Sequence, residues 1–142
     1  MASHPLFKKT KFPLDPKLCF VLMPFSKEFT DLYEDIIKPT VSGSGFTPLR
    51  ADEVFSTGVI IDDIWESINS ARFLIADVTD RNPNVFYELG IAHALGKDVI
   101  IITKSINDIP FDTRHIRHIV YTFTPRGAKK LEDDLRLTIQ SL

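Results

Sequence analysis

The segment FLIADVTDRNPNVFYELGIAHALGK, residues 73–97, carries the clearest structural signal in this chain. Its first six residues form an apolar run of strand length, which predicts a buried strand over 73–78. A polar loop follows at 79–82, and a helix is predicted from Pro83 or Asn84 to Leu95. Open α/β sheets build their ligand sites from such parts, at the carboxyl ends of the strands. The segment therefore predicts both a central strand and a site.

The rest of the chain continues the alternation of strands and helices. Further strands are predicted at 18–23, 46–50, 98–103 and 118–124, and further helices at 28–41, 59–71 and from 126 to the end. This order predicts a parallel sheet with helices on both faces. Right-handed crossovers leave few topologies, and five strands favour an α/β, flavodoxin-like three-layer sandwich of order 2-1-3-4-5. Residues 23–27 would then face residues 77–88 across one crevice.

Composition and length narrow the class of protein. The 142 residues are 44% hydrophobic and 25% charged, as is usual for one globular domain, which we place at 18–142 behind a flexible, proline-containing arm at 1–17. The net charge of −2 and the lack of a basic cluster argue against a DNA or RNA polymer as partner. No apolar run is long enough for a membrane span. We expect a cytoplasmic protein that has no contact with a membrane.

Glu88 is the residue of this segment that structure alone explains least well. On the predicted helix it shares a face with Ala92 and Leu95. A carboxylate on a partly apolar face has to be paired, protonated or functional, and such a glutamate can act as a nucleophile or a general base. Gly90 keeps this helix smooth, so the helix can lie close to the sheet or let a flat ring approach. The alternative is that Glu88 is a solvated helix residue and that Gly90 serves only tight packing.

Asp77, at the end of the strand, and Asp80, in the loop, strengthen the case for chemistry. A second carboxylate near a nucleophilic one can stay protonated and act as the acid, if its surroundings separate the two pKa values. The alternative for Asp77 is a buried carboxylate that accepts hydrogen bonds from the backbone or from Arg50. Asp80, Asn82 and Asn84 can equally be loop and cap formers, and for the two asparagines we favour that role.

Residues 23–27, Met-Pro-Phe-Ser-Lys, form the other wall of the predicted crevice. We expect ligand contacts from Met23, Phe25 and Ser26, and Ser26 can also cap the following helix. Asp52 belongs to a charged cluster at the carboxyl end of the second strand and is a further candidate for ligand binding.

Several kinds of site are excluded by missing motifs. Neither G-x-x-x-x-G-K-[ST] nor G-x-G-x-x-G occurs, so no nucleotide cofactor is expected in those cradles. The histidines and the single cysteine lack the spacing of metal ligands, so no metal is expected. No G-x-S-x-G or Cys-His pattern supports acyl transfer.

At residues 76–97 the sequence resembles the nucleoside 2-deoxyribosyltransferase family and the related deoxynucleoside 5′-monophosphate N-glycosidases. The resemblance implies that Glu88, in Tyr-Glu-Leu-Gly, attacks C1′ of the sugar and displaces the base. The glycosyl-enzyme ester would then pass the sugar to another base or to water, as in retaining glycosidases. Asp77 would orient the sugar or assist protonation of the leaving base, with Asp80 as the alternative.

The resemblance also implies a nucleoside or nucleotide as ligand and a homodimer or larger assembly. Residues 23–27 differ from the Gly-rich or aromatic segment of family members of known activity, so the base, the sugar, the phosphate and the choice between transfer and hydrolysis stay open. TIR-like domains share the sheet order and a glutamate on a comparable helix. The alternatives are therefore a TIR-like NAD-cleaving or nucleotide-sensing domain, or a non-catalytic nucleotide-binding module.

Overall fold

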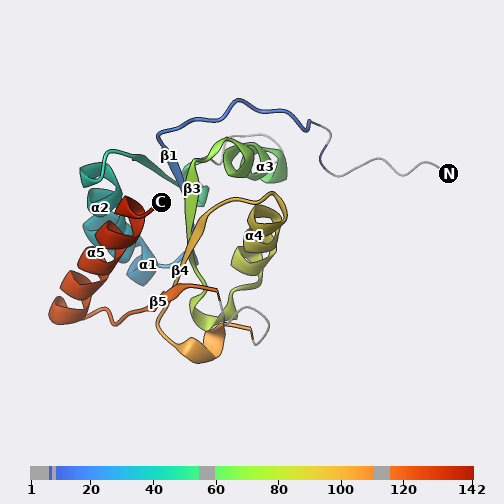
Figure 1. Cartoon of the computed structure of the whole chain (residues 1–142). Coiled ribbons are helices and arrows are strands. Elements are labelled where there is room, and N and C mark those ends of the chain that lie inside the picture. The colour runs from blue at the N-terminus through green and yellow to red at the C-terminus, as the bar shows by residue number, and fades with distance from the viewer. Residues whose placement is uncertain (1–6, 8, 55–59, 111–115) are drawn as a thin grey trace.

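The computed structural model describes residues 7, 9–54, 60–110 and 116–142. Five parallel strands form one sheet in the order β2-β1-β3-β4-β5, which confirms the predicted flavodoxin-like order (Figure 1). The strands are β1 (Leu18–Leu22), β2 (Thr47–Arg50), β3 (Phe73–Asp77), β4 (Val99–Thr103) and β5 (His118–Val120). The α-helices are α1 (Lys27–Leu32), α2 (Lys38–Gly43), α3 (Ile60–Ser70), α4 (Pro83–Ala94) and α5 (Pro125–Gln140).

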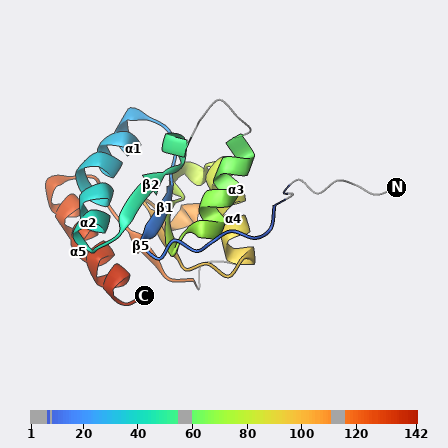
Figure 2. The same ribbon diagram turned by 90° about the horizontal axis from the view of Figure 1, so that it is seen from above.

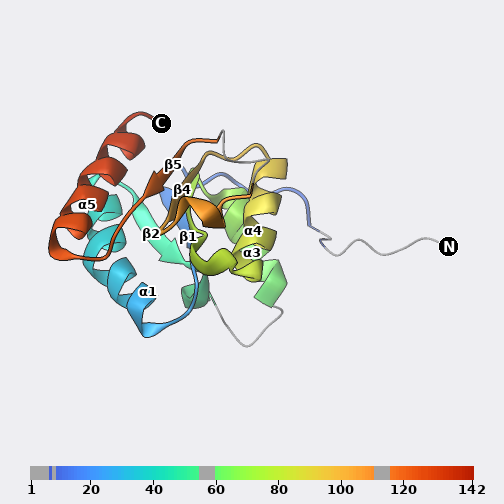
Figure 3. The same cartoon turned by 90° about the horizontal axis from the view of Figure 1, so that it is seen from below.

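The helices form two layers, one on each face of the sheet. Figures 2 and 3 show α1, α2 and α5 on one side and α3 and α4 on the other. Because successive side chains of a strand point to opposite faces, β3 contributes Phe73 and Ile75 to the core under α1, α2 and α5, and Leu74 and Ala76 to the core under α3 and α4. All five residues of β3 are buried, as the apolar run predicts.

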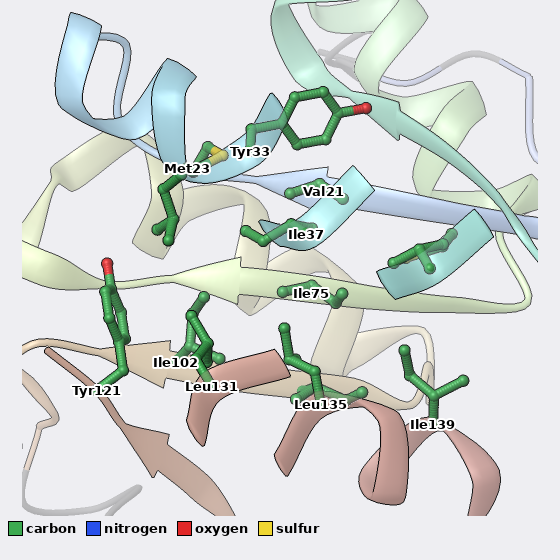
Figure 4. Close-up of a cluster of buried hydrophobic side chains, with 14 of the residues drawn as sticks. Val21, Met23, Tyr33, Ile37, Ile75, Ile102, Tyr121, Leu131, Leu135 and Ile139 are labelled. Atoms are coloured by element: carbon green, nitrogen blue, oxygen red, sulfur yellow. The ribbon is translucent and has the colours of Figure 1, made fainter. Parts of the chain in front are cut away.

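In the core under α5, side chains that recur with helical periodicity pack against side chains that alternate along the strands. Leu131, Leu135 and Ile139 recur every four residues on α5 and pack against Ile75 and Ile102 of the sheet (Figure 4). Each buried side chain of this kind contributes about 1.5–3 kcal/mol by leaving water. This apolar layer fixes α5 on the face of the sheet that lies away from α3 and α4.

Some predicted boundaries differ from the structure. Strand β5 ends at Val120 rather than at residue 124, and its pairing with β4 ends at Thr103. The first helix contains a π-helical turn at Tyr33–Ile37 between α1 and α2. Ser26 occupies the N-cap position of α1, but its side chain makes no capping hydrogen bond. The predicted start of the second helix at residue 59 lies outside the described residues.

The arm was expected to be loosely held, yet its described residues contact α3. The indole Nε1–H of Trp65 donates a hydrogen bond of 2.6 Å to the carbonyl oxygen of Lys9. The ring of Phe7 stacks on the ring of Trp65, and the backbone N–H of Asp15 donates to the carbonyl oxygen of Ser70 at 2.8 Å. Residues 1–6 and 8 of the arm lie outside the described part of the chain.

Among the helices that the structure describes, none is long and apolar enough to cross a membrane.

Candidate active site

A cavity of about 370 Å³ lies where the chain leaves β1, against α3 and α4. This volume is in the range of small-molecule sites. Its walls come from four parts of the chain: Met23, Pro24 and Phe25 after β1; Ile64 and Trp65 on α3; Asn82, Asn84, Val85, Tyr87, Glu88 and Ile91 at and in α4; and Phe7 on the arm. The cavity is therefore the crevice predicted between residues 23–27 and 77–88, extended by α3 and the arm.

Glu88 lines this cavity with a half-buried side chain. On the same helix, Val85, Leu89 and Ala92 are buried against the sheet, and this packing sets the rotation of α4. Within the described residues, no hydrogen bond or ion pair reaches the Glu88 carboxylate. Burial raises the pKa of Glu88 to about 7. A carboxylate with this pKa exists in both protonation states near neutral pH, which is suited to nucleophilic or acid-base chemistry.

Asp77 is fully buried and does not line the cavity. It lies on the β3 face that points to α1, α2 and α5, where its Oδ2 accepts a hydrogen bond from the hydroxyl of Tyr121. Its Oδ1 accepts from the backbone N–H of Thr79 at 2.9 Å and from the Thr79 hydroxyl at 2.5 Å. Burial raises the pKa of Asp77 to about 6, against the lowering effect of these hydrogen bonds. The structure thus does not bring Asp77 together with Glu88.

The sequence left open whether Asp77 accepts hydrogen bonds from the backbone or from Arg50, and its hydrogen-bond partners in the structure decide this. Backbone and hydroxyl groups hold Asp77, whereas the Arg50 side chain pairs with Asp52 instead, with Nε at 2.6 Å from Oδ1. Arg50 also donates to the Thr30 hydroxyl at 3.1 Å. Asp52 is therefore occupied by an ion pair at the end of β2, and it does not line the cavity.

The loop between β3 and α4 turns through an unusual backbone. Asp80 and Arg81 have φ angles of 61° and 55°, in the left-handed region that costs about 1–2 kcal/mol for a residue with a side chain. Contacts to the segment after β4 hold this turn: the Asp80 N–H donates to Asp108 at 3.2 Å, and the Arg81 guanidinium donates to the Asn107 carbonyl oxygen at 2.9 Å. The Asp80 side chain is exposed and lies outside the cavity lining.

Asn82 follows this turn and has both of the roles considered from the sequence. Its Oδ1 accepts hydrogen bonds from the backbone N–H groups of Asn84 at 3.0 Å and Val85 at 3.2 Å, so it caps α4. The side chains of Asn82 and Asn84 also line the cavity, next to Glu88. They supply amide groups that can hydrogen-bond the hydroxyls of a ligand.

The remaining predicted contacts divide into two groups. Met23 and Phe25 line the cavity, as expected, whereas Ser26 is exposed and lies outside the lining. The explanation of Gly90 by tight packing is wrong: Gly90 is on the exposed side of α4, and a Cβ there would meet nothing within 4 Å.

Three aromatic residues of the cavity were not predicted: Phe7, Trp65 and Tyr87. Trp65 belongs to the apolar stripe that helical periodicity predicts for residues 59–71, and periodicity cannot distinguish a stripe that faces the core from one that faces a cavity. The available signal for Phe7 was its aromatic side chain in an arm that has no helix or strand pattern. A large apolar side chain is often buried against another part of the protein.

The described residues contain no group of three or more His, Cys, Asp or Glu side chains that could hold a metal ion.

Solved structures with the same fold include deoxyribosyltransferases and a TIR domain. The 2-desoxiribosyltransferase from Leishmania mexicana matches with a TM-score of 0.53 and 23% identity, over 63% of this chain and 66% of that chain. A 2-deoxyribosyltransferase from Bacillus psychrosaccharolyticus gives 0.60 and 15%, over 82% and 90%. The TIR domain of a Toll-related receptor from Hydra magnipapillata gives 0.62 and 14%, over 83% and 97%. The TM-scores of 0.53–0.62 show a shared fold, and at identities of 14–23% they show the fold alone.

Sequence comparisons add no family assignment. No protein-family model and no curated protein matches the chain. The chain therefore shares only its fold with deoxyribosyltransferases and TIR domains, and a shared fold does not determine function, which depends on the residues of the site.

Proposed function

We propose that the chain is an enzyme that cleaves or transfers at the N-glycosidic bond of a nucleoside or nucleotide, with Glu88 as the nucleophile. The observation that carries the proposal is a half-buried carboxylate with a pKa raised to about 7, in a cavity of nucleoside size. The fold shared with two deoxyribosyltransferases supports the same reaction class. The Tyr-Glu-Leu-Gly motif around Glu88 supports it independently.

The proposed reaction has two displacements at C1′ of the sugar. The Glu88 carboxylate oxygen forms a bond to C1′ while the bond from C1′ to the base nitrogen breaks, and the electron pair leaves with the base, which takes a proton from water. In the second step the nitrogen of another base, or a water oxygen, attacks C1′. The ester bond breaks as the new bond forms, and its electron pair returns to Glu88 as a carboxylate. The attacking nitrogen or water loses its proton to the hydroxide that the first step left in the solvent.

In this proposal the neighbours of Glu88 bind and orient the sugar. Asn82 and Asn84 line the same cavity as Glu88, so their side-chain amides are the candidates to bind the sugar hydroxyls. Asp77 acts as a positioning residue, because its bonds to Thr79 and Tyr121 fix the start of the loop that leads to α4. A direct contact of Asp77, Asp80, Ser26 or Asp52 with the ligand forms no part of the proposed mechanism.

A second candidate is cleavage of the nicotinamide glycosidic bond of NAD. It follows from the resemblance to TIR-like domains, and the fold is shared with a TIR domain over 97% of that domain. The bond type and the nucleophile are the same in both candidates, so the two differ only in the substrate.

The test is release of free base from a panel of 2′-deoxynucleosides, their 5′-monophosphates and NAD, followed by chromatography. We expect release from at least one substrate. Replacement of Glu88 by Gln should abolish it, since a neutral amide cannot form the ester. Glu66→Gln is the matched control, because it removes an exposed carboxylate of α3 that does not line the cavity. Base release that survives in the Glu88→Gln protein would refute the covalent mechanism.

Intact-protein mass spectrometry tests the intermediate itself. A 2′-fluorinated nucleoside slows both displacements, because fluorine destabilises their oxocarbenium-like transition states. With a base that leaves readily, the first step stays faster than the second, and the protein should become heavier by one fluorinated sugar. The adduct should map to Glu88. No release from any substrate, together with a rise in melting temperature on adding a nucleotide, would instead support a non-catalytic binding module.

A further inference from the structure

Three contacts of the N-terminal arm converge on one side chain of α3, Trp65. The Phe7 ring stacks on the Trp65 ring with 4.3 Å between centroids and an angle of 11° between planes. The Phe12 ring meets it edge-on at 6.5 Å and 81°. The Lys9 carbonyl oxygen accepts the hydrogen bond of the Trp65 indole N–H at 2.6 Å. The arm is thus anchored through its backbone and through two rings.

The two phenylalanines of this anchor differ in one respect. Phe7 lines the cavity that contains Glu88, together with Trp65, whereas Phe12 does not line it. Phe25 and Tyr87 line the same cavity, and more than half of each side chain is exposed, at 56% and 52%. Large aromatic surfaces that stay exposed beside a cavity are typical of ligand sites.

These aromatic walls complement a flat ring. Nucleobases bind proteins by stacking on aromatic side chains, and this works for every base because each has a π-face. The polar residues of the lining, Asn82, Asn84 and Glu88, lie at the start of α4 and within it. Three of the four aromatic residues come from other segments: Phe7 from the arm, Phe25 from the residues after β1, and Trp65 from α3. The cavity of about 370 Å³ exists with Phe7 in place, which makes the Phe7 ring a wall of the cavity rather than a plug.

We propose that the arm is part of the ligand site: Phe7, held in place by Trp65, packs against the base of the bound nucleoside. The inference rests on the proposed function and deepens it by assigning the base to the aromatic wall, with the sugar toward Glu88. Phe7 is then a binding residue, and Phe12 and Lys9 only anchor the segment that carries it.

Binding of free adenine and free thymine tests this without turnover, since a free base contains no glycosidic bond. Trp65 is the only tryptophan of the chain and lines the cavity, so its fluorescence reports binding directly. We expect Phe7→Ala to raise the Kd about tenfold, from the loss of one stacking contact. Phe12→Ala should change the Kd less than about twofold, because it removes an anchoring ring outside the cavity.

Each outcome decides the inference. Equal weakening by Phe7→Ala and Phe12→Ala, at equal melting temperatures, would show that the arm acts only through its attachment and would overturn the inference. An unchanged Kd in Phe7→Ala, or no saturable fluorescence change with either base, would overturn it as well. If the base is bound through Phe7 but no substrate releases base, the proposed reaction fails and the inference stands. If base is released with an unchanged KM in Phe7→Ala, the inference fails and the reaction stands.

Discussion

Replacing Glu88 by Gln should stabilise the protein, and only at neutral and alkaline pH. Burial raises the pKa of this carboxyl from 4.5 to about 7 in the folded protein. At about pH 4 the carboxyl is protonated in both the folded and the unfolded states, so its ionisation has no effect on the free energy of unfolding. As the pH rises toward 7, the unfolded state ionises first and the free energy of unfolding falls. Above about pH 7 the folded protein bears the full free-energy cost of burying the ionised carboxylate.

The size of the effect follows from the two pKa values. A rise from 4.5 to about 7 corresponds to about 3 kcal/mol at 1.36 kcal/mol per pH unit. The side chain is only half-buried, and screening by water reduces this to about 1–2 kcal/mol. For a domain of this size, the melting temperature of the Glu88→Gln protein should exceed that of the unaltered protein by about 3–6 °C at about pH 8.5 and match it near pH 4.

Urea unfolding of both proteins across this pH range measures the difference. Comparing the two proteins at each pH cancels the contribution of Asp77, which is present in both. Glu66→Gln serves as the control for the loss of one charge, since it removes an exposed carboxylate. Parallel stability curves, with no gain for Glu88→Gln at high pH, would refute the reasoning that Glu88 is desolvated. A gain in stability together with a loss of activity would show that the site keeps this carboxylate at a cost.

Three further predictions concern the elements that support the site. Gly90→Ala should raise the free energy of unfolding, measured in urea, by about 0.5–1 kcal/mol, because alanine favours the helix and its Cβ meets open space. A lower stability would show that another part of the protein covers this side of α4. Asn82→Ala should lower the free energy of unfolding by about 1 kcal/mol through loss of the α4 cap, and an unchanged midpoint would contradict the capping role. Tyr121→Phe should destabilise by about 1–3 kcal/mol, because it leaves one oxygen of the buried Asp77 without its donor. In the unaltered protein this hydrogen bond lowers the pKa of Asp77. Its loss should therefore raise that pKa and move the pH dependence of unfolding near pH 6 upward, and an unmoved profile would contradict this role.

The sheet order and most element boundaries could be predicted from the sequence, because local patterns encode them. Apolar runs of strand length alternate with helical periodicity, and few right-handed topologies suit five such strands. Strand β3 and helix α4 lie within one residue of the predicted limits. The end of β5 was predicted too late, because the strand stops where its pairing with β4 ends, and a pairing limit is set by another strand.

The location of the candidate site could be predicted from the sequence, but the residues that line it could be predicted only in part. Residues 23–27 and the start of α4 were expected at one crevice, and Met23, Phe25, Asn82, Asn84 and Glu88 line the cavity there. Ser26 and Asp52 do not line it, because Ser26 is exposed at the start of α1 and Asp52 pairs with Arg50.

Residues 73–97 alone indicated a strand, a turn and a helix with a carboxylate on a partly apolar face. Tertiary structure decided which way each carboxylate points. Strand alternation turns Asp77 toward Tyr121 and α5, whereas the packing of α4 leaves Glu88 at the cavity on the opposite face. The aromatic side chain of Phe7 did not indicate Trp65 as its partner, because a sequence pattern records periodicity within an element and not which distant surface a side chain reaches.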